Sequence, residues 1–258
     1  MNIRGYRLGA DSIMEAFLYM LKDAEFKIKY IIAAIFLGIA SFLGLFSMSL
    51  SQNITNLPTM FLISLLSILS ILLLFIYIGY WFSCIRYLRE NKTADIELPP
   101  IEQWKNFITA FKFFIASVLF GGTITISLIP IKIPVLGLVY GITLGLLILA
   151  LGIFYTIYFP ALIAIFTKIE TYTIYFKITN AFNKAKKAGI HYYKTILILA
   201  MLSIGIGIII SILNYIVILI NNIFLTILVA AIMGLILVYL SYVTAYLIAN
   251  CINLSDKR

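Results

Sequence analysis

The chain has 258 residues, of which 63% are hydrophobic and only 11% carry a formal charge. Soluble domains are about half apolar and about a quarter charged, so a mean hydropathy of +1.10 excludes an ordinary soluble domain and a disordered chain. The two cysteines are too few for a disulfide scaffold, and no metal-ligand spacing involves them.

Four long segments contain no Asp, Glu, Lys or Arg, and they cover residues 30–85, 113–131, 133–167 and 195–255. A transmembrane helix needs about 20 apolar residues. The first and last segments are long enough for two helices each, and polar residues interrupt both. We therefore predict six spans in an all-α, polytopic bundle that forms one membrane domain over 1–258. They cover about 30–50, 59–84, 112–129, 135–159, 194–217 and 223–249.

The basic residues indicate how this bundle is oriented. In the six-span topology every lysine and arginine except Lys132 falls on the side of the two termini. Cytoplasmic loops are enriched in Lys and Arg, so we expect a multi-pass protein of the cell membrane with both termini in the cytoplasm. The same asymmetry accounts for the net charge of +9, so we expect no nucleic-acid partner.

Each odd-numbered span follows a short segment with helical apolar spacing, which predicts three amphipathic helices on the cytoplasmic side. The first follows Ser12, the second follows Pro100, and the third holds Tyr175, Ile178, Phe182 and Ala185, with Gly189 as its cap. The order of one amphipathic segment followed by two spans recurs three times along the chain, which suggests a threefold internal repeat. The lysines of the third segment are candidates for contact with lipid headgroups: Lys184, Lys186 and Lys187.

Small residues mark candidate packing faces within the spans. Gly137, Gly141 and Gly145 recur every four residues and place a glycine groove on one helix face. Ala34 with Gly38, and Ala40 with Gly44, offer shorter versions in the first span. We favour packing within one chain over a dimer contact.

A set of short motifs is spread over the first 200 residues of the chain: Ala16-Phe17 and Tyr19, Lys22-Asp23, Gly79-Tyr80, Arg86, Leu98-Pro99, Trp104, Phe107, Lys112, Pro160 and Tyr192-Tyr193. These motifs resemble those of a prokaryotic multi-pass membrane family of unknown function, DUF4013. The resemblance covers about residues 11–200, although Ala24 stands where the family usually has proline after Lys22-Asp23. It implies a membrane fold and location but no activity.

The spans hold no ionisable residue at depth, and all ten acidic residues lie in the predicted cytoplasmic segments. Ion-coupled transporters usually need such a residue inside the bilayer, so we expect no ion transport. The sequence contains no metalloprotease motif, no P-loop and no carboxylate pair within a span. We expect neither an enzyme nor a cofactor. His191 alone cannot form a metal site.

Two function classes remain open. The first is a non-catalytic membrane scaffold or anchor for a partner, either a second membrane protein or another copy of this chain, in contact with membrane lipids. The second is a transporter or channel for an uncharged or lipid-like substrate. The polar residues of the spans could line its path, namely Thr123, Thr125, Ser127, Asn214, Ser241 and Thr244. A polar cavity at membrane depth would favour transport, and a packed bundle would favour a scaffold.

Overall fold

The computed structural model describes residues 16–18, 21, 25–51, 57–90, 98–127, 137–220 and 222–256. Within these residues the fold is all-α. Six helices are long and apolar enough to cross a membrane, in agreement with the predicted fold class and number of spans. The elements are α2 (Phe26–Ser51), α3 (Leu57–Glu90), α4 (Gln103–Ser127), α5 (Gly137–Ile169), the 3₁₀ helix η3 (Ile174–Lys177), α6 (Ile178–Ala188), α7 (Ile190–Ile220) and α8 (Ile223–Asp256).

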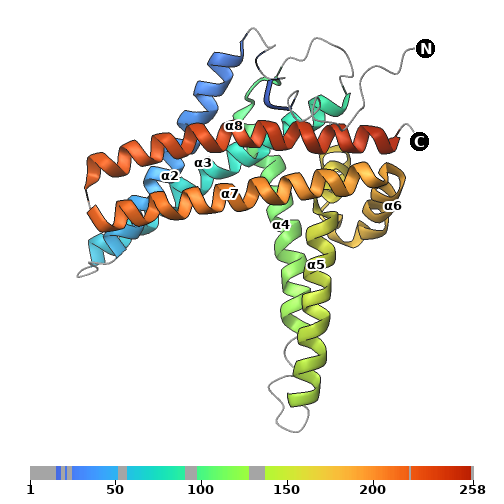
Figure 1. The fold of residues 1–258 in the computed structure, drawn as a ribbon. Coiled ribbons are helices and arrows are strands. Elements are labelled where there is room, and N and C mark those ends of the chain that lie inside the picture. Colours follow the sequence, from blue (N-terminus) through green and yellow to red (C-terminus); the bar gives the residue numbers. More distant parts are fainter. Residues whose placement is uncertain are drawn as a thin grey trace.

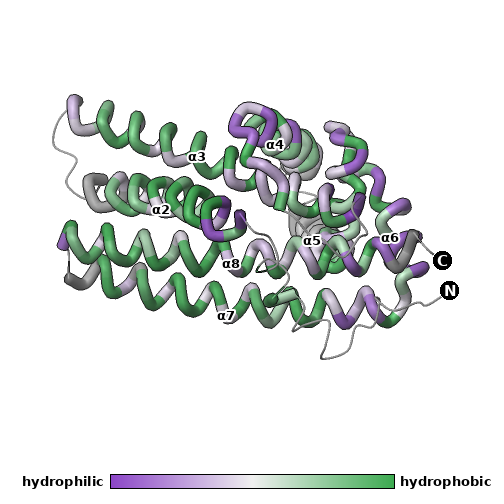
Figure 2. Tube along the Cα trace, turned by 90° about the horizontal axis from the view of Figure 1, so that it is seen from above, coloured by the Kyte–Doolittle hydropathy of each residue, from purple (hydrophilic) through white to green (hydrophobic). Residues whose placement is uncertain are grey.

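The helices extend further than predicted at the end of the bundle where α3 and α8 end and α7 begins, which we call the charged end. There α4 starts at Gln103 rather than near 112, and α5 continues to Ile169 rather than ending near 159. A charge-free run stops at the first lysine or glutamate, but a helix can continue past the bilayer with charges on it. Figure 2 shows hydrophilic residues concentrated at this end and hydrophobic residues along the rest of α3, α7 and α8.

The three predicted amphipathic segments differ in what the structure shows for them. The first lies mostly outside the described residues, apart from a helical turn at 16–18. The second is the beginning of α4 itself, which runs unbroken from Gln103 to Ser127. The third is the separate helix α6, and Gly189 caps its end, as predicted. The φ of Gly189 is 63°, and its N–H donates to the Ala185 carbonyl oxygen at 3.0 Å. Its placement on a membrane surface stays a prediction, as does the threefold repeat.

Four spans run side by side: α2 packs on α3 and α8, and α7 packs on α8. The α4–α5 pair projects crosswise from this layer near the charged end, so the six helices do not share one direction (Figure 1). The helix α6 closes the charged end, where it contacts α5 and α8.

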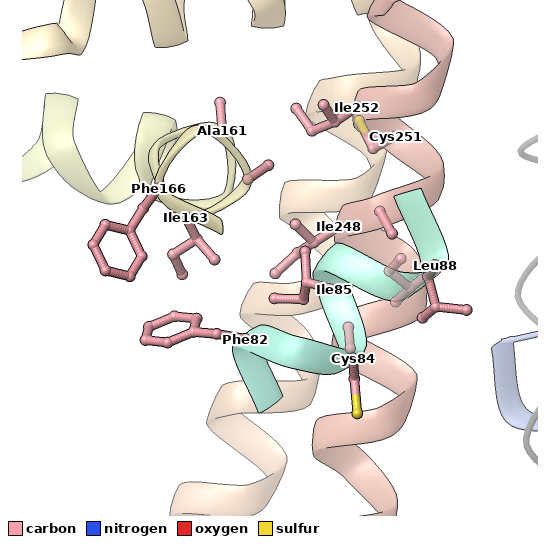
Figure 3. Packing of buried hydrophobic residues seen from close by; sticks show 14 of the residues in the cluster. Phe82, Cys84, Ile85, Leu88, Ala161, Ile163, Phe166, Ile248, Cys251 and Ile252 are labelled. Atoms are coloured by element: carbon pink, nitrogen blue, oxygen red, sulfur yellow. The ribbon is translucent and has the colours of Figure 1, made fainter. Parts of the chain in front are cut away.

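The largest buried cluster lies at the charged end, where α3, α5 and α8 meet. Phe82 and Ile85 of α3 face Ile163 and Phe166 of α5, and Ile248 of α8 packs beside them (Figure 3). The Phe82 and Phe166 rings lie 5.3 Å apart in an edge-on arrangement. Both cysteines, Cys84 and Cys251, are buried free thiols.

Small residues of α2 form two packing seams within the chain. A Cβ atom on Gly234 of α8 would lie 2.8 Å from the Ala34 carbonyl oxygen and 3.0 Å from the Gly38 backbone, so α2 and α8 are in close contact there. Ser70 of α3 donates to the Ala40 carbonyl oxygen at 2.7 Å. The interpretation of Ala34 and Gly38 as an intramolecular contact agrees with this geometry.

Candidate functional site at the charged end

Three charged side chains, from α3, α4 and the residue that follows α5, meet at the charged end. Lys112 of α4 donates to Glu170 Oε2 at 2.9 Å, and Arg86 of α3 donates to Glu170 Oε1. Arg86 Nε also donates to the Thr167 carbonyl oxygen of α5 at 2.6 Å. Because Glu170 directly follows α5, this ion cluster of Arg86, Lys112 and Glu170 ties α3 and α4 to the end of α5.

Glu170 occupies a helix-ending position that usually favours glycine. Its φ is 48°, and its N–H donates to the Phe166 carbonyl oxygen at 2.7 Å, which terminates α5. A side chain in this left-handed conformation costs free energy, and a glycine would avoid that cost. The ion pairs that only a carboxylate can form here offset the backbone cost.

The electrostatics of the cluster keep Glu170 ionised. Burial disfavours its charged form, but the hydrogen bonds from Lys112 and Arg86 outweigh burial and hold the pKa of the carboxyl group below its usual value. The cluster therefore contains two cations and one anion, all partly shielded from water. Arg86 and Lys112 both donate to acceptors of this chain, so the arrangement holds α3 and α4 against the end of α5.

Next to this cluster α3 and α4 approach each other closely. A Cβ atom on Gly79 would lie 2.7 Å from the Asn106 Cα atom and still closer to the Asn106 carbonyl group. Asn106 is 1% exposed, and its Oδ1 accepts a hydrogen bond from Ser83 at 2.9 Å. Gly79 is thus the residue that lets the two helices cross at this point.

A polar cavity of about 230 Å³ opens beside this crossing, between α3 and the segment that leads into α4. Its walls carry both signs of charge, and within them Lys105 pairs with Glu102 at 2.9 Å. The volume is sufficient for several water molecules. The lining residues are Ser83, Arg86, Tyr87, Glu90, Pro99, Pro100, Glu102, Lys105 and Asn106.

The model of a protein family of unknown function, DUF4013, matches residues 62–215 of this chain, which is more than half of its length. The chain belongs to the DUF4013 family. No curated protein and no solved structure matches the chain.

The DUF4013 match begins later than the resemblance suggested and runs past residue 200, so Ala16, Phe17 and Tyr19 lie outside it. Several motif residues inside it take part in contacts between helices or with the segment that leads into α4. Gly79 permits the crossing of α3 and α4, and Arg86 and Lys112 bind Glu170. The Leu98 carbonyl oxygen accepts a hydrogen bond from Lys29 at 2.7 Å.

The structure does not bring the predicted site residues into the ion cluster. Lys184, Lys186 and Lys187 lie on α6, where Lys186 and Lys187 are exposed and Lys184 is half-buried. Gly137, Gly141 and Gly145 lie in the first part of α5, but their surroundings are outside the described residues. Both sets stay predictions.

The ion cluster was not predicted from the sequence, because Arg86 and Lys112 served there only as markers of orientation and of the family resemblance. One signal could have pointed to it. Glu170 is the only acidic residue between 168 and 194, a segment with six lysines, and it directly follows an apolar helix. A single acid among several cations at a helix end is a candidate partner for cations on neighbouring helices.

Proposed function

We propose that this DUF4013 protein is a non-catalytic scaffold or anchor in a prokaryotic cell membrane, with both termini in the cytoplasm. The observation that carries the proposal is how its polar side chains are used. Several of those described in the middle of the bundle and at its charged end bind other helices of the same chain, which favours a fixed framework over a path for solutes.

Ser241 and Thr244, which a transport path could have used, connect α8 to α3 instead. The Tyr77 hydroxyl group contacts the Ser241 hydroxyl group. Trp81 Nε1 donates to the Ser241 carbonyl oxygen at 3.0 Å and to Thr244 Oγ1 at 3.2 Å. Nearer the opposite end of the spans, the hydroxyl oxygens of Ser47 and Ser67 lie 2.7 Å apart and connect α2 to α3. Such bonds hold helices together in lipid.

One observation favours the alternative, a transporter or channel for an uncharged or lipid-like substrate. An apolar groove of about 500 Å³ runs between α2 and α8. Its lining is apolar, so it suits a hydrocarbon chain rather than an ion or a sugar.

Two measurements separate these functions. The protein is purified from its native membrane in mild detergent through two chromatographic steps, and separately reconstituted into liposomes. We expect a second membrane protein to stay bound through both chromatographic steps, at a constant ratio to this chain. We expect neither lipid scrambling nor flux of sodium, potassium or protons above that of empty vesicles. If the chain purifies alone and scrambles lipid, the lipid transporter becomes the better proposal. Ion flux above that of empty vesicles would contradict both functions.

A further inference from the structure

The groove between α2 and α8 has a narrow floor and high apolar walls. Ala34 and Ala230 are buried at its floor, where the two backbones are in close contact. The isoleucines of α2 that line it, Ile31, Ile35 and Ile39, are about half exposed. The groove therefore stays open along its length instead of being filled by side chains of this chain.

The length of the groove matches one leaflet of a bilayer. On α2 it extends from Ile31 to Phe42, which at 1.5 Å per residue is about 16 Å. The hydrocarbon core of a bilayer is about 30 Å thick, so one leaflet contributes about half of that. On α8 the groove extends from Ile227 to Leu235, in the half of that helix that is farther from the charged end.

A lysine lies at the end of this groove. Lys27 precedes Ile31, Ile35 and Ile39 by successive helical turns, so it is on the same face of α2, one turn beyond the groove. It is exposed. Two other charged residues near the start of α2 have partners within the chain. Lys29 donates to the Leu98 carbonyl oxygen at 2.7 Å and forms an ion pair with Glu25 at 3.3 Å.

We propose that this groove binds one acyl chain of an anionic phospholipid, with the headgroup phosphate at Lys27, near the start of α2. Apolar packing alone discriminates little between lipids in a bilayer, because the surrounding chains are equally apolar. The cation at the groove end supplies the preference for an anionic headgroup.

Charge also argues against a second copy of the chain as the occupant. Two copies related by a two-fold axis along the membrane normal would present the same surface to each other at the same depth. Their Lys27 side chains would then approach one another. An anionic lipid instead brings the opposite charge to that position. This site is separate from the proposed function, because a scaffold and a lipid transporter could both contain it.

The test measures lipid binding to the purified full chain by native mass spectrometry, with phosphatidylglycerol and phosphatidylcholine as probes. Ala231→Phe places a large side chain in the groove from an exposed position on α8. We expect it to lower phosphatidylglycerol binding at least about tenfold. Ala200→Phe, the same change at an exposed position of α7 away from the groove, is expected to leave binding unchanged.

A second pair of variants tests the headgroup. Lys27→Gln should reduce the preference for phosphatidylglycerol over phosphatidylcholine about fivefold, as expected for one lysine at a lipid surface. Lys186→Gln, at an exposed lysine of α6, should not change it. An unchanged preference in the Lys27 variant would overturn the headgroup assignment.

A third measurement needs no variant and so does not depend on a mutant folding. Phosphatidylglycerol with a photoreactive group in its acyl chain is crosslinked to the wild-type chain. Adducts are expected within residues 31–42 and 227–235. Adducts only elsewhere would overturn the proposal. A dimer that Ala231→Phe converts to a monomer, without loss of lipid, would also overturn it and make a second copy the occupant.

Discussion

Gly79 and Asn106 are in contact through their backbones, with no space for a side chain on Gly79. Gly79→Ala would therefore have to separate α3 from α4, or distort one of them. We expect it to lower the free energy of unfolding by about 3 kcal/mol, the upper part of the usual range for an overpacked site. Thermal unfolding in detergent measures this effect.

Gly205→Ala is the matched control, because a Cβ atom on Gly205 of α7 would meet no atom within 4 Å. Alanine also has the higher helix propensity, so this control should be as stable as the wild type or slightly more so. Equal unfolding temperatures for the two variants would show that α3 and α4 do not cross at Gly79.

Glu170→Gln removes the negative charge of the ion cluster and keeps the shape of the side chain and its left-handed backbone. Arg86 and Lys112 would then lose their ion-pair partner while remaining partly buried. We expect a loss of about 1–3 kcal/mol at neutral pH, measured by thermal unfolding. A variant as stable as the wild type would show that the cluster does not hold the three helices together.

The same residue predicts a pH dependence. The pKa of Glu170 is lowered in the folded chain from its ordinary value of 4.5. A lowered folded pKa means that this stabilisation is complete above about pH 4.5 and is lost as the pH falls through the folded value. The stability difference between wild type and Glu170→Gln should therefore shrink on acidification below about pH 4.5. A difference that grows there would contradict the sign.

Gly141 tests the glycine groove that the sequence predicts on α5. Gly141→Leu should separate that helix from a neighbour and lower both expression and thermal stability in detergent. Thr143→Leu is a control in the same helix, at an exposed position. If both variants behave like the wild type, the glycine face does not pack against a helix.

The number and approximate position of the spans could be predicted from sequence, because charge-free runs of this length and hydropathy are typical of membrane-spanning helices. The seam at Ala34 and Gly38 was also identifiable, since small residues one turn apart permit close contact. These features depend on local composition and spacing.

Other features depend on how distant helices meet. Arg86, Lys112 and Glu170 are separated by long stretches of chain and come together only through the crossing of α3, α4 and α5. Helices that are apolar on every side, such as α3 and α8, do not indicate which face packs on a neighbour. The groove between α2 and α8 and the crosswise placement of α4 and α5 could not be predicted for this reason.

The six-span topology is the central claim, and Lys132 is its most informative position. It lies in the connection between α4 and α5, the pair that projects crosswise from the other four spans (Figure 1). The charge asymmetry predicts that this connection crosses to the outside, which requires α4 and α5 to span the bilayer with the rest.

The measurement that tests this claim most directly is labelling of single cysteines in intact cells with an impermeant thiol reagent. Cys84 and Cys251 are first replaced by alanine, and cysteines are placed at Asn56, Lys132, Asn222 and, as an internal control, Lys186. We predict labelling at Asn56, Lys132 and Asn222, and labelling of Lys186 only after the membrane is opened. If the cysteine at position 132 is not labelled while those at positions 56 and 222 are, the chain crosses the membrane only four times. Labelling at Lys186 alone would invert it.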